Sequence, residues 1–493
     1  MSNLKQRTIN GMAWSISERV GLQVIHMLIS IILARLLDPS EFGLIGMLAI
    51  FTSIAKSILD SGFGSALIQK KDATQTDSSS IFYFNLLIGF ILAGIFFFSA
   101  PVIANFYNQP ILKPITRILS LNMIINAFGI VHFSILRKKM EFKNHFIVSI
   151  TAVIISGLCG IIAAFKGIGV WSLVIQSLSL SLAQTVLLWL FNKWRPVGHF
   201  SLDSLKTMFS FGSKLLIADL MDMIFRNVHQ TFIGKIYEPS DVGYYSQATT
   251  METAATVATS MALGQVIFPA FSPYQNDNST LKQMHGKIIK MSMFLHTPLM
   301  IGLIVIAEPL ILVLLTDKWA NSIPYFQLLS IVGLFYPIRV QNYNLFRIKG
   351  RSDLILKLSL IRYALTAIAL ALTYKHGILA LIYGQIVVVV LSQIIASHMA
   401  GRLIKYGLFE LIKALIPSMA GALVMGIIVF LLGKINIESI LIKLSVQISA
   451  GILIYYLINK LLKSAELMEF ISISRNLLQN LILKIKGILC KNH

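Results

Sequence analysis

The segment that decides the fold is MFSFGSKLLIADLMDMIFRNVHQTFIGKIYEPSDVG, residues 208–243. It begins as an apolar run long enough to cross a membrane and ends in a turn that contains Pro and Gly. The apolar run carries Asp219, Asp222, Arg226 and His229. At about 100° per residue, these four groups fall within roughly 80° of one helix face. Because a charged group costs a few kcal/mol in lipid, this face predicts a water-accessible pathway.

The turn that ends this segment has an earlier copy. Residues 234–243, GKIYEPSDVG, repeat the pattern of residues 34–43, ARLLDPSEFG, at an interval of 200 positions. At an interval of 210, Pro114, Leu119-Ser120, Arg137 and Lys139 recur as Pro324, Leu329-Ser330, Arg347 and Lys349. Two registers that differ by ten residues indicate one duplicated unit with an insertion in the second copy.

The composition is that of an integral membrane protein. The 493 residues are 56% hydrophobic and 13% charged, whereas soluble domains have about 25% charged residues. Runs of about 20 apolar residues predict fourteen membrane-spanning helices. They are placed near residues 9–33, 43–67, 81–104, 115–135, 145–165, 169–191, 208–232, 244–271, 288–312, 323–346, 355–374, 377–399, 411–432 and 440–459.

The predicted architecture is all-α and has three parts. Residues 1–200 form an N-terminal lobe with six helices, and residues 201–405 form a C-terminal lobe that repeats it. Because each lobe has an even number of spans, both enter the membrane from the same side, with a pseudo-twofold axis along the membrane normal and a central cavity between them. Residues 406–493 add two helices and a basic tail, which is predicted to be an amphipathic helix or a solvated segment.

The basic residues predict the orientation. The chain has 42 Lys and Arg against 21 Asp and Glu. The N-terminus, every second loop and the tail hold 27 of these cations, and the alternate loops hold nine. The positive-inside rule therefore places both termini in the cytoplasm. The same distribution explains the net charge of +21 without nucleic-acid binding.

Four predicted helices carry polar faces, and they are the first two of each repeat. The first has Arg19 and His26, and the second has Lys56 and Asp60. The seventh is the segment described above, with Lys214 nearer the cytoplasm, and the eighth has Glu252. Facing copies would bring these stripes together around the central cavity, where substrate sites of such transporters lie.

The basic groups in these faces form a candidate ladder for an anionic headgroup. Counting 1.5 Å per residue places Arg19 and Asp219 near the membrane midplane and Arg226 closer to the outside. Arg339, in the tenth span, is a further candidate. The alternative is that these groups form buried ion pairs that only fix helix packing, as Lys56 and Asp60 could do.

The sequence contains no pattern that predicts catalysis. It has no phosphate-binding loop of the Walker type and no His, Cys or Asp cluster with metal-ligand spacing. The predicted outer loops are about ten residues long, too short to hold the acceptor of a membrane glycosyltransferase or polymerase. We therefore expect a protein that is not an enzyme and has no cofactor.

Several motifs, in this order, resemble one transporter family. They are GMAW (residues 11–14), ARLLDPSEFG (34–43), GFGSALIQ (62–69), GYYSQA (243–248) and FPAFS (268–272). Together they resemble the polysaccharide-flippase, or Wzx-type, branch of the multidrug/oligosaccharidyl-lipid/polysaccharide exporter superfamily. One feature departs from that family, whose cavity is described as strongly cationic: the spans here hold six basic and six acidic residues.

The resemblance implies a flippase that moves an undecaprenyl-diphosphate-linked oligosaccharide across the bacterial plasma membrane. The polymer would be O-antigen, capsule, exopolysaccharide or a teichuronic-type chain, and the polymerase and chain-length machinery would be partners. The basic set Arg19, Lys56, Lys214, Arg226 and Arg339 would bind the diphosphate. The set Asp60, Asp219, Asp222, Glu252, His26 and His229 would bind sugar hydroxyls or a coupling H⁺ or Na⁺.

Two alternatives from the same superfamily stay open at this point. A cation-coupled multidrug antiporter would use the buried acids as its drug and ion site. A flippase for the lipid-linked peptidoglycan precursor would share the fourteen-span plan.

Overall fold

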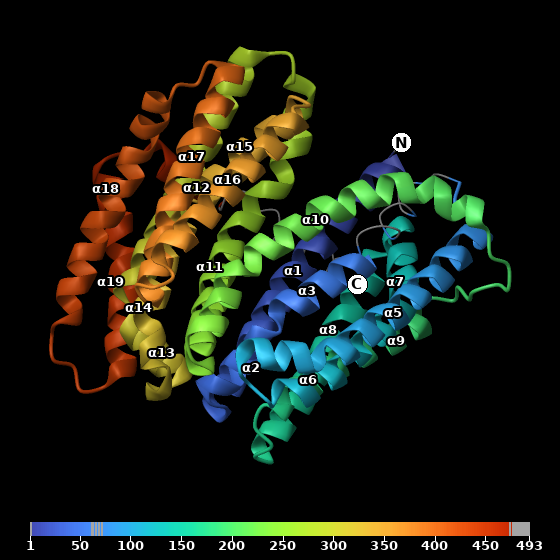
Figure 1. The fold of residues 1–493 in the computed structure, drawn as a ribbon. Coiled ribbons are helices and arrows are strands. Elements are labelled where there is room, and N and C mark those ends of the chain that lie inside the picture. Colours follow the sequence, from blue (N-terminus) through green and yellow to red (C-terminus); the bar gives the residue numbers. More distant parts are fainter. Residues whose placement is uncertain are drawn as a thin grey trace, which may run out of the picture. The chain divides into compact units, whose positions relative to one another are not determined.

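The computed structural model describes a chain of helices and connecting turns (Figure 1). It covers the backbone of residues 2–60, 64, 67, 70, 72–472 and 475. Within these helices, the side chains of residues 2–17, 19, 60, 204, 207–215, 218, 258 and 260–272 are not described. The predicted basic tail beyond residue 475 lies outside the described residues. An all-helical fold agrees with the prediction from the sequence.

Contacts between residues divide the chain into two compact units. Unit 1 is Met1–Ala254 with Leu314–Ser322, and unit 2 is Ala255–Val313 with Ile323–His493. The boundary falls inside one long helix, so the start of the second sequence repeat packs with the first repeat. The predicted lobes, divided at residues 200 and 405, follow the sequence repeat and remain a prediction.

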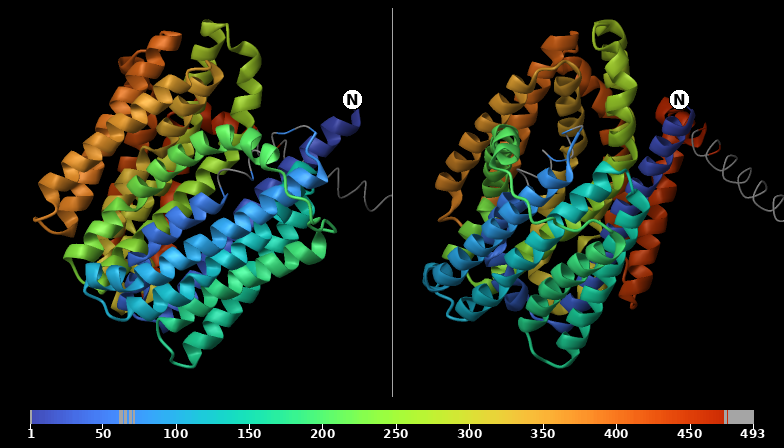
Figure 2. Two further views of the ribbon diagram at one scale, coloured as in Figure 1. Left: turned by 45° about the vertical axis from the view of Figure 1, so that its right-hand side comes forward. Right: turned by 90° about the vertical axis from the view of Figure 1, so that its right-hand side faces the viewer.

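Unit 1 contains the helices from α1 to the first half of α11, coloured blue to green in Figure 2. They are α1 Ser2–Leu36, α2 Pro39–Met47, α3 Ala49–Asp60, α5 Gln75–Tyr107, α6 Leu112–Leu119, α7 Leu121–Lys138, α8 Phe142–Phe165, α9 Trp171–Phe191, α10 Leu202–Ile236 and the first half of α11 Pro239–Phe271. The short 3₁₀ helix η2, Asp317–Ser322, also belongs to it. α8 packs along both α1 and α9, and α10 packs on α3.

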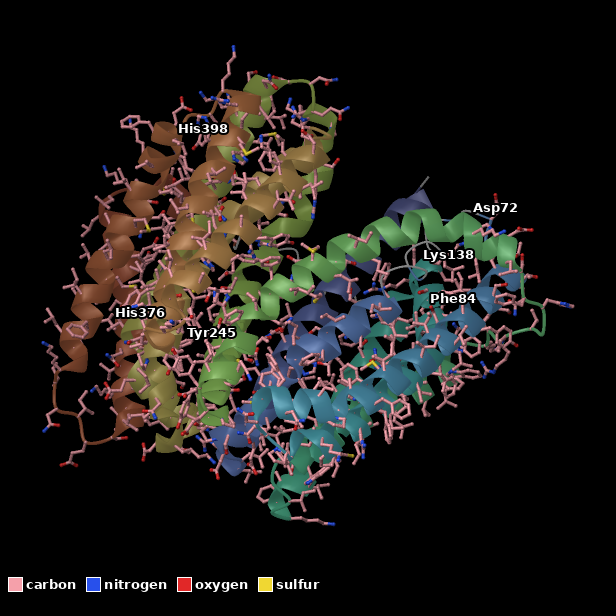
Figure 3. The ribbon with its side chains drawn as sticks, in the orientation of Figure 1. Asp72, Phe84, Lys138, Tyr245, His376 and His398 are labelled. Carbon is pink, nitrogen blue, oxygen red and sulfur yellow. The ribbon has the colours of Figure 1, made fainter. Side chains whose placement is uncertain are left out.

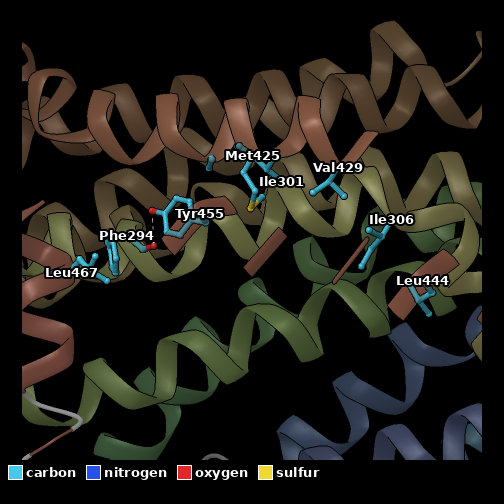
Figure 4. Packing of buried hydrophobic residues seen from close by; sticks show 9 residues of the cluster. Phe294, Ile301, Ile306, Met425, Val429, Leu444, Tyr455 and Leu467 are labelled. Carbon is cyan, nitrogen blue, oxygen red and sulfur yellow. Dashed lines mark hydrogen bonds between the residues drawn. The ribbon is translucent and has the colours of Figure 1, made fainter. Parts of the chain in front are cut away.

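Unit 2 contains the remaining helices. They are η1 Ser272–Tyr274, α12 Asn278–Val305, most of α13 Ala307–Leu315, α14 Ile323–Leu334, α15 Tyr336–Ile348, α16 Ser352–Thr373, α17 Ile378–Ile404, α18 Leu408–Gly433 and α19 Ile440–Leu461. Figure 3 labels His376, in the turn before α17, and His398, inside α17 near its end. A cluster of buried apolar side chains joins α12, α18 and α19, with Phe294, Met425 and Tyr455 among its members (Figure 4).

Ten helical segments in the described part of the chain are long and apolar enough to cross a membrane. They match ten of the fourteen predicted spans. The α2–α3 pair passes the same test as one span bent by 44°. The other three predicted spans, in α1, α10 and α11, are outside this set, and they are among the four predicted to carry polar faces. The chain is thus a multi-pass membrane protein, while the count of fourteen stays a prediction.

The structure supports the repeat at an interval of 210. The backbone N–H of Met140 donates to Arg137 O (3.0 Å), and that of Gly350 donates to Arg347 O (3.1 Å). Met140 and Gly350 both have positive φ angles, 57° and 66°. A residue in this left-handed conformation commonly follows the last turn of an α-helix and ends it. The two helices α7 and α15 therefore end in the same way.

A proline explains the break between α14 and α15. Pro337 has no N–H, so it cannot donate to the carbonyl of Gly333 four residues earlier. His296 of α12 replaces that donor, with Nε2 3.0 Å from Gly333 O. Its Nδ1 lies 2.6 Å from Thr259 Oγ1 of α11. The imidazole thus joins three helices of unit 2 at the break.

Candidate functional site

Ten of the eleven predicted site residues fall within the range of unit 1. Only Arg339 belongs to unit 2. Unit 1 contains the first two spans of both sequence repeats: α10 packs on α2 and α3, and the first half of α11 is hydrogen-bonded to α1. The structure therefore brings the four predicted polar helices into one compact unit.

The predicted polar face of α10 is exposed in the middle of the helix. Asp219 and Arg226 are exposed and Asp222 is half-buried. Arg226 Nη2 donates to Asp222 Oδ2 at 2.6 Å, and 68% of the Arg226 side chain stays exposed. His229, one turn further along, is buried. On the predicted polar face, Asp219, Asp222 and Arg226 are thus at least partly exposed to solvent, whereas His229 is buried.

A second exposed group lies on α1 and α3. His26 and Lys56 are both exposed, and Lys56 is close enough to His26 to act on it electrostatically. One turn beyond His26, Ser30 of α1 exchanges a hydrogen bond of 3.3 Å with Gln247 of α11. This bond links the first helix of one repeat to the second helix of the other.

The other candidates are placed less completely. Arg19, Lys214 and Asp60 lie on described helices, but their side chains are outside the described set. Glu252 is half-buried on α11 and accepts from Thr253 Oγ1 at 3.4 Å. Arg339 is half-buried in unit 2, with its guanidinium 4.9 Å from the centre of the Tyr336 ring. Its role in a common site with unit 1 stays a prediction.

Exposure of these charges within predicted spans has a physical consequence. Lys56, Asp219 and Arg226 would each cost a few kcal/mol if they met hydrocarbon. Charged side chains at membrane depth therefore face the inside of a bundle or a water-filled space. Because these three are exposed rather than buried among helices, the arrangement favours a water-filled space beside α3 and α10.

One buried polar pair was not predicted. Glu18 Oε1 lies 2.6 Å from His145 Nδ1, and both side chains are nearly inaccessible to solvent. Glu18 lies next to Arg19 on α1, and His145 is in the first turn of α8. The pair anchors α1 to α8, so Glu18 belongs to the packing of unit 1.

The repeated turns begin two helices in the same way. Asp38 N donates to Glu41 Oε2 at 2.8 Å, and Glu238 N donates to Asp241 Oδ2 at 3.4 Å. In each turn a proline occupies the first helical position, where no N–H is needed. The Pro-Ser-acid pattern is therefore a capping arrangement that starts α2 and α11.

The two turns also pack directly against each other. A β-carbon on Gly43 would overlap the carbonyl oxygen of Pro239, and one on Gly243 would overlap the carbonyl oxygen of Pro39. This reciprocal contact is what a local twofold axis between the copies requires. We call the contact between Pro39–Gly43 and Pro239–Gly243 the loop junction.

Trp319 of η2 covers the loop junction. Its side chain is fully buried, and its ring centre is 5.4 Å from that of Phe42 and 6.1 Å from that of Tyr244. Its Nε1 donates to Ala34 O at 2.8 Å. The Tyr245 that follows Tyr244 on α11 is labelled in Figure 3. The segment that carries Trp319 thus ties the connection between α13 and α14 to unit 1.

We expect Trp319→Phe to lower the melting temperature of the purified protein. The phenyl ring keeps the contacts to Phe42 and Tyr244 but leaves the Ala34 carbonyl without its donor, at a cost of about 1–3 kcal/mol. The measurement is thermal unfolding in detergent. Trp171→Phe is the matched control, because no indole hydrogen bond is described for Trp171; equal melting temperatures for the two variants would contradict the assignment.

Comparison with known proteins points to one family. The model of a family described as polysaccharide biosynthesis protein matches residues 32–324. The teichuronic acid biosynthesis protein TuaB of Bacillus subtilis (strain 168) is 27% identical, over 87% of this chain and 90% of its own length. The lipopolysaccharide biosynthesis protein WzxC of Escherichia coli (strain K12) is 25% identical, over 73% and 74%.

Solved structures show which fold this is. The lipid II flippase MurJ, in an inward closed conformation, matches with a TM-score of 0.76 and 15% identity, over 91% of this chain and 98% of its own. A multidrug resistance MATE family transporter, inward-facing, matches with a TM-score of 0.62 and 15% identity, over 78% and 96%. At these identities the likeness shows the fold alone.

Proposed function

Because this chain belongs to the polysaccharide biosynthesis protein family, we propose that it is a flippase for a lipid-linked oligosaccharide. The resemblance predicted from its motifs is thus confirmed at the level of the family. The substrate would be an undecaprenyl-diphosphate-linked repeat unit, moved from the inner to the outer leaflet of a bacterial plasma membrane. The reaction breaks no covalent bond, so no catalytic residue is required.

The observation that carries this proposal is the exposure of Lys56 and Arg226 on helices of a membrane protein. A diphosphate is a compact dianion that Arg and Lys bind through charge-assisted hydrogen bonds. Arg19, Lys214 and Arg339 would extend the basic set. The names of TuaB and WzxC, which act in teichuronic acid and lipopolysaccharide biosynthesis, support a surface polysaccharide as the product.

The acidic groups and histidines would have a second task. Asp219 and Asp222 lie near Arg226, and Asp60 and Glu252 lie on α3 and α11, within the range of unit 1. They would accept hydrogen bonds from sugar hydroxyls or take a coupling H⁺ or Na⁺, with His26 and His229. The mixture of charges would suit a cargo that has an anionic diphosphate and neutral sugars.

The loop junction would act in alternating access. We infer from the cation distribution that both termini are cytoplasmic, which places the junction at the outer face. When the substrate site opens to the outside, the outer ends of the first two spans of each repeat must separate. The Gly43–Gly243 contact would form when the outer side closes and open when the sugar is released.

Deletion of the gene tests this proposal. We expect a complete undecaprenyl-linked repeat unit to accumulate on the cytoplasmic side, because synthesis of the unit continues while its transfer stops. The measurement is extraction and mass spectrometry of lipid-linked intermediates from the deletion strain. Normal surface polymer with altered resistance to cationic dyes would indicate a multidrug antiporter. Accumulation of the peptidoglycan precursor would indicate a flippase for that lipid.

A further inference from the structure

A cavity in unit 2 is separate from every candidate site residue described above. It has a volume of about 520 Å³ and lies between α12 and α19, beside α18. α12 packs closely on α18, and α18 on α19, whereas α12 and α19 meet at few positions. The cavity is therefore the space that the last two helices leave against the second repeat.

The walls of the cavity suit hydrocarbon. Leu299, Leu303, Val429 and Ile452 are among the apolar side chains that line it. Its polar side chains already bond inside the protein: Tyr455 OH donates to Phe294 O at 3.0 Å, and Gln447 Nε2 donates to Val429 O at 3.2 Å. All three helices are long and apolar enough to span the membrane, so we expect the cavity to face lipid rather than water.

One end of the cavity is closed by the chain that follows α19. The chain turns at Lys463, where φ is 48°, and a helical segment then brings Leu467 and Phe470 into the lining. Lys287 Nζ pairs with Glu469 Oε1 at 2.7 Å and fixes this segment to α12. The closed end is thus built by the segment that follows α19 and by its ion pair with α12.

The same end carries two exposed lysines. Lys460 Nζ lies 5.9 Å from the ring centre of Tyr456, which lines the cavity, and Lys463 is exposed in the turn. Lysines at a membrane surface attract anionic headgroups, by about fivefold in affinity for each charge. An apolar cavity with cations at one end matches a lipid with an acyl chain and an anionic headgroup.

We propose that this cavity holds one acyl chain of an anionic phospholipid, with its headgroup at Lys460 and Lys463. The volume lies within the range of about 300–1,000 Å³ that binds one small ligand. The lipid would fill the space between α12 and α19 and so join the added helix pair to the second repeat. The inference rests on unit 2 alone and does not depend on the proposed function.

Native mass spectrometry of the purified protein tests the proposal. We expect one tightly bound phosphatidylglycerol per chain in the wild type and its loss in Gly302→Trp. Gly302 lines the cavity, and a β-carbon there meets no atom within 4 Å, so a side chain can start there without displacing a neighbour and the indole would occupy the cavity. Gly94→Trp on α5, where a β-carbon also meets nothing within 4 Å, is the matched control and should keep the lipid.

A second measurement tests the proposal if the Gly302→Trp protein does not accumulate in the membrane. Phosphatidylglycerol with a diazirine on its acyl chain should crosslink to residues 447–456 of the wild type. Lys460→Gln with Lys463→Gln should reduce its preference over phosphatidylethanolamine by about 25-fold, about fivefold for each lysine. Retention of the lipid in Gly302→Trp, crosslinks only elsewhere, or a bound polyprenyl lipid in place of phospholipid would overturn the proposal.

Discussion

Gly243→Ala should prevent the loop junction from forming and abolish polymer export. The new β-carbon would overlap the carbonyl oxygen of Pro39, which is a backbone atom and cannot rotate away as a side chain can. The cost should therefore exceed the about 1–3 kcal/mol that is typical of an overpacked core. We expect a lower melting temperature and no surface polymer, because an outer side that cannot close leaves no state that loads substrate from within.

The symmetry of the contact supplies two controls. Gly43→Ala should have the same effect, because its β-carbon would overlap the carbonyl oxygen of Pro239. Gly94→Ala should be neutral or slightly stabilising, since its β-carbon meets nothing and Ala is the better helix former. If Gly43→Ala and Gly243→Ala both melt and export like the wild type, the packing described for the junction is wrong.

Arg226→Ala should abolish surface polymer while the amount of protein in the membrane stays unchanged. An exposed ion pair contributes about 0–1 kcal/mol to stability, so loss of the Arg226–Asp222 pair should not unfold the protein. Loss of a cation that binds the diphosphate should stop transfer. The measurement is surface polymer by antibody or lectin staining, normalised to protein level by immunoblot.

Two further variants separate binding from helix packing. Arg351→Ala removes an exposed arginine that pairs with Asp353 in the same way, Nη2 to Oδ2 at 2.7 Å, at the start of α16. It should export normally. The double variant Asp222→Arg with Arg226→Asp keeps an ion pair but moves the cation by one helical turn. This variant should be as inactive in polymer export as Arg226→Ala. Full activity of this exchanged pair would mean that the pair serves packing alone.

Much of the fold was predictable because it depends on local patterns. Length and hydropathy predicted spans that ten described helices match, and the Pro-Ser-acid pattern predicts a helix start from local hydrogen bonds alone. The repeat at an interval of 210 predicted matching segments, and α7 and α15 do end with the same backbone hydrogen bonds. The family was recognisable from the same short motifs.

The contacts between distant segments could not be predicted in this way. The repeat shows that Gly43 and Gly243 are equivalent, but equivalence does not require that they touch. Glu18 and His145 come from helices that no sequence pattern pairs. Trp319 lies in the connection between α13 and α14, and nothing in its neighbours predicts that it packs on α2 and α11.

The candidate site was predictable in part. A helical period placed Asp219, Asp222, Arg226 and His229 on one face, yet the structure buries His229 and exposes Arg226. Periodicity tells which residues share a face, whereas the neighbour that covers each turn depends on tertiary packing. The role of each charged residue in transport therefore rests on experiment.

The most direct test of the central claim is transfer of the substrate in reconstituted vesicles. The purified protein is inserted into liposomes that contain a fluorescent undecaprenyl-diphosphate oligosaccharide, and dithionite, which does not cross the membrane, is added outside. With active protein nearly all of the fluorescence should be lost, whereas vesicles without protein or with Arg226→Ala should keep about half. Retention of half the fluorescence by vesicles with the wild-type protein would contradict the assignment as a flippase.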